Sequence, residues 1–296
     1  MAIGVTDLES DPITAAIRVS VPDRGLRQDL RAISIVWRRE LIRFRSDRLR
    51  AFSSLVQPVL FLLVLGTGLS SLARSGLPAG IDFKTYIYPG VLAMSVLFTA
   101  LFSAASIVWD REFGFLREML VAPVSRSAIV IGKCLGGATV ATLQGMVILA
   151  LAGVAHVPYD AVLFLTLIGE LLLLSFTLTA FGVMMAARIK QIQAFMALTQ
   201  MLVMPLFFLS GALYPLNGLP GWLTVLTRLD PLTYIVDPMR HAVFSHLPIP
   251  PGMAAALSPG VTWFGWPVPI ALSLSIVALM GAGMLGIAIM EFQRPE

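Results

Sequence analysis

The residues of this chain that could carry out chemistry are few and widely spaced. Its single cysteine, Cys134, can form neither an internal disulfide nor a thiolate metal site. His241 and His246 are five residues apart, whereas two metal ligands on one helix face are four apart. Asp230 and Asp237 could be a catalytic carboxylate pair, but each precedes a proline, and Asp-Pro is first a turn or helix-start signal. The sequence therefore predicts no catalytic residue and no metal site.

One carboxylic acid, Glu170, interrupts a long apolar run. A charge near the centre of a bilayer costs about 3 kcal/mol on insertion scales, so Glu170 needs either a partner or a proton. It could face a substrate path and select cationic or amphipathic compounds. Alternatively, it is a protonated carboxyl group that is hydrogen-bonded to a neighbouring helix through Gln144 or Gln200.

Nucleotide hydrolysis by this chain is not expected. A phosphate-binding loop needs glycine-rich backbone N–H groups and a lysine that converge on the phosphates. The only Gly-Lys pair is Gly132-Lys133, which is followed by Cys134, and Ser127 stands five positions before Gly132. The energy for any transport would have to come from another subunit or from an ion gradient.

The elements that would position these residues are membrane-spanning helices. The chain is 57% hydrophobic and 13% charged, whereas a soluble domain carries about a quarter charged residues. A helix needs roughly 20 apolar residues to cross the hydrocarbon core. Suitable runs predict spans at about residues 52–72, 86–109, 130–154, 161–186, 194–213 and 267–290. The predicted fold is an all-α integral membrane protein with a six-helix transmembrane domain at residues 51–290.

The basic residues indicate the orientation of these spans. If the N-terminus is cytoplasmic, 17 of the 21 basic residues fall in cytoplasmic segments, as the positive-inside rule requires. Residues 1–25 are predicted to be a disordered cytoplasmic tail without a cleavable signal peptide, and residues 291–296 a second cytoplasmic tail. Arginine outnumbers lysine 18 to 3, which favours a bacterial plasma membrane as the location.

Residues 26–50 have the pattern of an amphipathic helix. Leu26, Leu30, Ile33, Trp37, Leu41 and Phe44 fall on one stripe, and most arginines fall on the opposite side. Such a helix lies on the inner leaflet with its basic face toward anionic lipid head groups or an acidic protein surface. A membrane anchor without a protein partner is the alternative.

The loop between the second and third spans contains a short amphipathic pattern. Phe113, Leu116 and Leu120 recur at helical spacing among charged residues, and Pro123 ends the pattern. A short helix with an apolar edge is thus predicted in the cytosol, where it could bind a partner protein. Alternatively, it caps the protein's own bundle.

This loop and a second segment resemble the permeases of type-2 ATP-binding-cassette exporters, in particular the daunorubicin-resistance permease group. The first match comprises Arg111, Glu112, Phe113, Gly114, Leu116, Leu120, Pro123, Ser125 and Arg126. The second comprises Ser210, Gly211, Pro215, Leu219, Pro220, Asp230, Pro231, Tyr234, Asp237 and Arg240. The resemblance covers about residues 34–290, and Phe115 and Arg117 depart from the small polar and acidic residues common in the family.

The resemblance implies a half-transporter that dimerises and binds two cytosolic ATPase subunits, which would hold ATP and magnesium. This chain itself would hold no cofactor. The residues that would couple it to the ATPase are Arg111, Glu112, Phe113, Gly114, Leu116, Leu120 and Pro123. The residues that mark short extracytoplasmic re-entrant helices are Pro215, Pro220, Asp230, Pro231 and Tyr234.

We therefore expect an exporter permease that moves a drug, an antibiotic or a lipid and confers multidrug or antibiotic resistance. Its expected partners are the ATPase, a second copy or a homologous permease, and membrane lipids, but not nucleic acid. Two alternatives remain open at this point. One is a gradient-driven carrier that uses Glu170. The other is a membrane-embedded enzyme that depends on Asp230 or Asp237.

Overall fold

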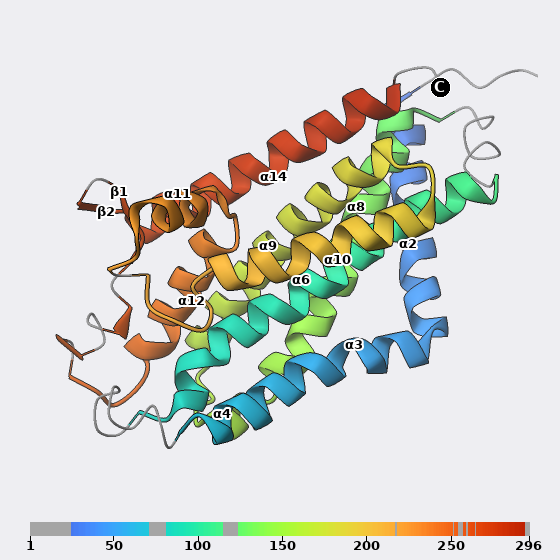
Figure 1. Ribbon diagram of the computed structural model, residues 1–296. Helices are drawn as coiled ribbons and strands as arrows, with labels where there is room; N and C mark the ends of the chain where they lie inside the picture. Colours follow the sequence, from blue (N-terminus) through green and yellow to red (C-terminus); the bar gives the residue numbers. More distant parts are fainter. Residues whose placement is uncertain are drawn as a thin grey trace, which may run out of the picture.

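The computed structural model describes residues 25–70, 81–114, 124–216, 218–250, 252–253, 257–258, 260–263 and 265–293. Within this part, long helices run side by side in a bundle, and α2 crosses the bundle at one end (Figure 1). Six described helices are long and apolar enough to span a membrane: Ala51–Gly68, α6 (Phe83–Glu112), α8 (Arg126–Leu149), α9 (Ala161–Arg188), α10 (Ile192–Leu209) and α14 (Ile270–Gln293). Their ends lie within five residues of the predicted span ends.

Helix α6 forms the centre of the bundle. Its apolar residues cover all sides of the helix, the pattern of a helix that is buried all round. The most apolar window of α6 is 89% buried, whereas the corresponding windows of the first span and of α14 are each 17% buried. Helices α3, α8, α9, α10 and α12 pack around α6. The outer helices therefore present apolar surface to lipid or to another protein.

The first span is not a regular α-helix throughout. It consists of α3 (Arg48–Leu60), the π-helix η1 (Phe61–Leu65) and α4 (Gly66–Gly68). Pro58 lies inside α3 and has no N–H to donate to the preceding turn. A proline followed by a π-helical turn is a recognised cause of local irregularity in a helix.

Helix α2 (Leu26–Ser46) is shorter than the predicted helix at residues 26–50. Asp47 leaves the helical conformation, and α3 begins at the next residue, so the chain changes direction there. The buried side chains of α2 are Ala32, Val36 and Glu40, which face the bundle. Because α8 covers this side of α2, only part of its surface is left for lipid.

The opposite end of the bundle is closed by short elements. They are the 3₁₀-helix η2 (Ala152–Ala155), α11 (Gly221–Leu229), α12 (Thr233–Ser245), and the strands β1 (Thr262–Trp263) and β2 (Trp266–Pro267), which pair antiparallel. Short helices were predicted between residues 215 and 244, and α11 and α12 occupy this segment. The β-hairpin was not predicted: residues 262–266 were given no secondary structure, and Pro267 was assigned to the start of the sixth span.

Candidate functional site

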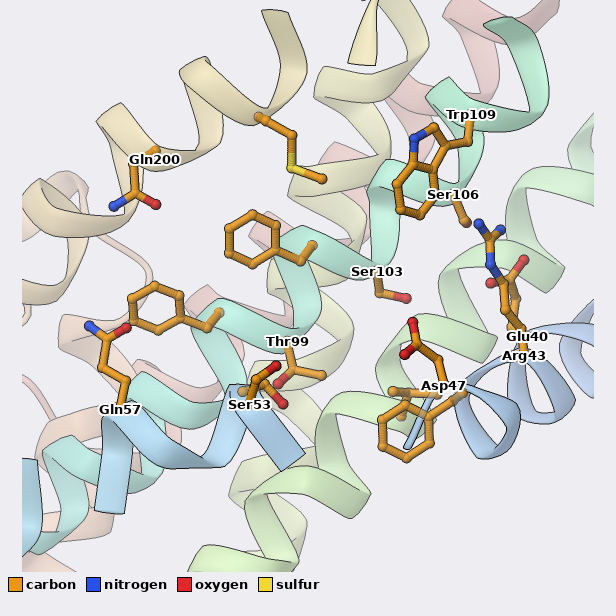
Figure 2. A pocket seen from close by; sticks show the side chains of 16 residues that line it. Glu40, Arg43, Asp47, Ser53, Gln57, Thr99, Ser103, Ser106, Trp109 and Gln200 are labelled. Carbon is orange, nitrogen blue, oxygen red and sulfur yellow. The ribbon is translucent and has the colours of Figure 1, made fainter. Parts of the chain in front are cut away.

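A cavity of about 440 Å³ lies near the α2 end of the bundle, between α2 and α3 on one side and α6, α8 and α10 on the other. Figure 2 shows side chains from these helices converging on it. Helix α6 contributes one face to the wall, with Phe98, Thr99, Phe102, Ser103, Ser106 and Trp109. These positions are spaced as a single helical stripe.

The lining of the cavity is amphipathic. Phe98 and Phe102 stack with their ring centroids 6.3 Å apart. Val140 and Met196 extend this apolar wall. Hydroxyl and amide side chains from α3, α6 and α10 lie between the apolar groups, so a bound molecule would meet both types of surface.

The charged lining residues all come from α2 and its junction with α3. They are Glu40, Arg43 and Asp47. The Arg43 guanidinium carbon lies 5.0 Å from the ring centroid of Trp109, a cation–π contact that links α2 to α6. The charged groups thus gather at one end of the cavity, where the Trp109 ring lies beside Arg43 (Figure 2).

A buried charge cluster adjoins this charged end. The Lys133 Nζ atom of α8 lies 2.5 Å from Asp110 Oδ2 of α6 and 2.7 Å from Glu40 Oε1 of α2. It also donates a hydrogen bond to Ser106 Oγ at 3.1 Å. Arg39 of α2 donates to the same Asp110 oxygen at 2.6 Å. Opposite charges within this distance stabilise one another where water is excluded.

The predicted coupling residues Arg111 and Glu112 belong to the last turn of α6. Arg111 donates hydrogen bonds to the carbonyl oxygens of Ala186, Ala187 and Ile189, where α9 ends. The Glu112 carboxylate accepts a hydrogen bond from the Ile192 N–H, where α10 begins. These contacts satisfy backbone groups that helix ends leave unpaired. Both side chains therefore bind the bundle itself, and contact with an ATPase stays a prediction.

The rest of the predicted coupling segment is only partly described. Phe113 is 70% exposed, and Gly114 has a φ of 84°, a left-handed conformation that glycine adopts without strain. Leu116, Leu120 and Pro123 lie outside the described residues. On the far side of this loop, the Arg126 guanidinium donates to the Phe292 carbonyl oxygen at the end of α14. Both flanks of the loop are thus tied to the ends of spanning helices.

Glu170 is buried in α9, with 5% of its surface exposed. Its Oε2 atom has no hydrogen-bond partner among the described residues. Of the two partners considered for Glu170, Gln144 donates its amide to Ala51 O and Ser54 Oγ instead. Gln200 lines the cavity.

The predicted extracytoplasmic residues form a structural cluster. Asp230 Oδ1 accepts a hydrogen bond from the Leu232 N–H across Pro231, so Asp230 shapes the turn between α11 and α12. The Tyr234 hydroxyl donates to the Arg228 carbonyl oxygen and accepts from Trp263 Nε1. Pro220 directly precedes α11. Pro215 lies in the turn segment after α10 and is exposed.

Two carboxylates of this cluster lie outside the spans: Asp230 is buried, and Asp237 is partly buried. Burial raises the pKa of Asp230 from its ordinary value of 3.8 to about 8, and the hydrogen bond from Leu232 opposes the shift. Burial also raises the pKa of Asp237, an effect that Arg240 and Ser258 oppose. Neither arrangement resembles a catalytic pair, because each carboxylate holds local structure. Within the described ranges, no group of three His, Cys, Asp or Glu side chains is placed to hold a metal ion.

Sequence reasoning missed the cavity and the charge cluster. Lys133 was considered as one of the basic residues that set the orientation and as the lysine of a Gly-Lys pair that lacks a phosphate-binding loop, but not as part of a buried cluster. Its position in the first turns of an apolar helix, seven residues after Arg126, was a signal that it could be buried. The stripe of hydroxyl and aromatic residues on α6 was a second signal, because a mixed face on an otherwise apolar span is typical of a cavity wall.

Comparison with known proteins identifies a family that shares most of this chain. Residues 31–244 match the ABC-2 type transporter family. The chain is 27% identical to the ycf38 protein of Cyanophora paradoxa over 227 residues, which cover 73% of this chain and 75% of that protein. It is 27% identical to nodulation protein J of Rhizobium leguminosarum bv. trifolii over 217 residues, 71% of this chain and 80% of the relative. The "Probable multidrug ABC transporter permease YbhR" of Escherichia coli (strain K12) is 29% identical over 160 residues, 53% of this chain and 43% of the relative.

Proposed function

Because this chain belongs to the ABC-2 type transporter family, we propose that it exports a hydrophobic or amphipathic compound through the cavity beside α2. Members of this family are the transmembrane subunits of ABC transporters and have no nucleotide-binding site of their own. The chain is therefore a transport permease subunit of an all-α integral membrane type, and it works with an ATP-binding-cassette ATPase. ATP and magnesium would be bound by that ATPase.

The amphipathic lining of the cavity supports the proposed class of substrate. Drug-sized ligands occupy pockets of about 300–1,000 Å³ that are mostly apolar with a few polar groups. A volume of about 440 Å³ with stacked phenylalanines and hydroxyl groups fits such a molecule. A relative whose name contains "multidrug ABC transporter permease" favours a drug, an antibiotic or a lipid as the substrate.

The distribution of basic residues supports the direction of transport. Arginines are concentrated in α2 and in the segments next to α6, α8 and α9 at the same end of the bundle. On the positive-inside rule, this end is cytoplasmic, and the start of α2 and the end of α14 lie there. The cavity would then receive its substrate from the cytoplasm or the inner leaflet of a bacterial plasma membrane.

The exposed apolar faces of the first span and α10 support a dimer. Phe52, Leu60 and Val64 project from the first span, and Met201 and Phe208 from α10, all with large exposed fractions. Both elements also form walls of the cavity. A second copy of this chain, or a homologous permease, would cover these faces and enclose the cavity further.

A gradient-driven carrier is the second candidate, favoured by the burial of Glu170 and by its unpaired Oε2 atom. Such a carrier would transport without ATP, and Glu170→Gln would abolish proton-coupled flux. A membrane-embedded enzyme is not proposed, because Asp230 and Asp237 hold turns and the family has a transport role.

The proposal is tested with the complex purified from native membranes together with its ATPase and reconstituted into liposomes. We expect ATP-dependent movement of a hydrophobic cationic dye or a fluorescent phospholipid. Loss of the Phe98 and Phe102 rings in a double alanine variant should reduce transport about tenfold, the equivalent of about 1.4 kcal/mol of lost binding. The matched control is Leu279→Ala, which alters an exposed residue of α14. Transport that follows a proton gradient and persists without ATP would contradict the proposal.

A further inference from the structure

Lys133 joins three helices at the point where the loop between α6 and α8 enters the bundle. Its Nζ atom lies 2.7 Å from Glu40 of α2 and 2.5 Å from Asp110 of α6, and Lys133 itself belongs to α8. The Lys133 side chain is 3% exposed and the Glu40 side chain 6% exposed. A buried lysine between two carboxylates fixes the relative positions of the helices that carry them, because each separation would leave a buried charge without its partner.

The helices are packed closely enough for this contact to be specific. A Cβ atom at Gly132 would lie 2.8 Å from Val36 Cβ, and one at Gly136 would lie 2.7 Å from Glu40 Cβ. Glycine at these two positions, one turn apart, therefore lets α2 lie directly against α8. The Trp37 indole donates to Thr139 Oγ1 at 3.0 Å, which fixes α2 along α8.

The two carboxylates are held in different ways. Asp110 Oδ2 accepts hydrogen bonds from both Lys133 and Arg39. Glu40 Oε1 accepts no hydrogen bond from the described residues, although it lies within ion-pair distance of Nζ. Lys133 is thus hydrogen-bonded to α6 and ion-paired with α2. Glu40 also lines the cavity, so the ion pair with α2 lies at the cavity wall.

Asp110 connects this cluster to the flank of the loop. It is followed directly by Arg111 and Glu112, which bind the end of α9 and the start of α10. The last turn of α6 is therefore tied to α2 and α8 on one side and to α9 and α10 on the other. A displacement of the α6–α8 loop therefore acts on this turn at one flank of the loop and on the start of α8 at the other.

We propose that Lys133 is a positioning residue for transport, which makes α2 and α3 follow the last turn of α6 when the ATPase moves the α6–α8 loop. This inference rests on the proposed function, because it assumes that an ATPase acts on the loop. The movement of α6 reaches α2 through Lys133 and Glu40 and also through the Arg39–Asp110 hydrogen bond, and through the junction at Asp47 it reaches α3 and the cavity wall. The ion pair between Lys133 and Glu40 therefore transmits this movement and also stabilises the packing of α2 against α8.

The test measures the movement of the cavity wall without the need for a known substrate. Gln57 of α3 and Gln200 of α10 both line the cavity and come from different walls (Figure 2). In the full complex with Cys134→Ser, cysteines are introduced at both positions and joined with a bifunctional thiol reagent. The cross-linking yield is compared between the nucleotide-free complex and the complex trapped with ATP and vanadate.

We expect the yield to change on trapping in this parent complex and in Lys133→Arg, which keeps the charge. In Lys133→Met and in Glu40→Gln, the change should be strongly reduced while ATP hydrolysis continues, because the Arg39–Asp110 hydrogen bond still joins α2 to α6. Glu40→Gln keeps the Lys133–Asp110 pair, so it tests the link to α2 even if Lys133→Met fails to assemble. The matched control is Arg38→Met, which removes an exposed charge from α2, the helix that carries Glu40, and should retain the change in cross-linking yield.

In the same variants, the ratio of dye transport to ATP hydrolysis should fall about tenfold, within the usual range for coupling between two sites. A parent complex that hydrolyses ATP without any change in yield would overturn the proposed function as well as this inference. A normal parent response that is retained in both Lys133→Met and Glu40→Gln would overturn the inference alone.

Discussion

At the scale of single residues, the polar groups outside the spans have mainly structural roles. Arg240 is buried, donates to the Gly211 and Ala212 carbonyl oxygens, and lies over the Tyr86 ring at 4.6 Å. These contacts attach α12 to α6 and to the end of α10. Asp230 and Tyr234 hold the turn between α11 and α12 through hydrogen bonds to the backbone. The second matched segment, from Ser210 to Arg240, therefore stabilises the end of the bundle opposite α2.

Asp230 gives the first prediction at this scale. Its pKa is raised from 3.8 to about 8 by burial, so the folded protein favours the protonated carboxyl. Stability that is fully present below pH 3.8 is therefore lost as the pH rises toward about 8. We expect the melting temperature of the detergent-solubilised protein to fall between about pH 4 and about pH 8 and to level off above that, and Asp230→Asn to flatten this slope.

The comparison variant for this experiment is Asp47→Asn, which changes an exposed aspartate at the α2–α3 junction. It should retain the slope of the parent protein. A slope that is equally steep with and without Asp230 would show that another group is responsible.

At the scale of elements, the contact between α2 and α8 decides where the amphipathic helix lies. The sequence pattern alone predicted that its apolar stripe enters the lipid. In the structure, Ala32, Val36 and Glu40 are buried against the bundle, and Leu26 and Leu30 remain exposed. Helix α2 is thus bound by protein on one face and is free on the neighbouring apolar face, which suits a position at the edge of a membrane.

The glycines of α8 make this contact testable. Gly136→Ala would place a methyl group 2.7 Å from Glu40 Cβ, and such overpacking costs about 1–3 kcal/mol of folding free energy. In Gly286→Ala of α14, the new methyl group meets nothing within 4 Å, and we expect a gain of about 0.5–1 kcal/mol because alanine favours a helix. Thermal unfolding in detergent should therefore move the melting temperatures in opposite directions. Equal shifts would mean that α2 does not lie against α8.

At the scale of the whole molecule, the asymmetry of charge and the exposed faces determine how the protein sits in its surroundings. The α2 end carries most of the arginines, and the other end carries the short helices and the hairpin. The central helix α6 is covered by protein, whereas the first span, α10 and α14 are largely exposed. A molecule with this distribution requires lipid or another protein to cover its apolar surface.

Labelling in intact cells tests the orientation. In a Cys134→Ser background, Tyr159→Cys places an exposed thiol at the end opposite α2, and Phe113→Cys and Ile35→Cys place thiols at the α2 end. We expect a membrane-impermeant maleimide to label position 159 in intact cells, and positions 113 and 35 only after permeabilisation. The reverse pattern would invert the proposed orientation and with it the direction of transport.

The family resemblance of the sequence is confirmed by the match to the ABC-2 type transporter family, and the all-α integral membrane class is confirmed with it. The spans could be predicted because each must bring about 20 apolar residues together in the chain, which is a local property. The ends of the spans were predicted less closely: α8 runs from Arg126 to Leu149, whereas the predicted span was 130–154. The hairpin at residues 262–267 was missed because turn residues alone do not specify pairing.

What the sequence determined by itself was the number of spanning helices, their apolar character and the lack of a phosphate-binding sequence motif, since these depend on neighbouring residues. Only the tertiary structure decided that Lys133 is buried between Glu40 and Asp110, and that α2, α3, α6 and α10 enclose a cavity. These residues are far apart in the chain, and their contact depends on how whole helices pack. Helix packing is set by the sum of many weak contacts, so a single position in the sequence does not reveal it.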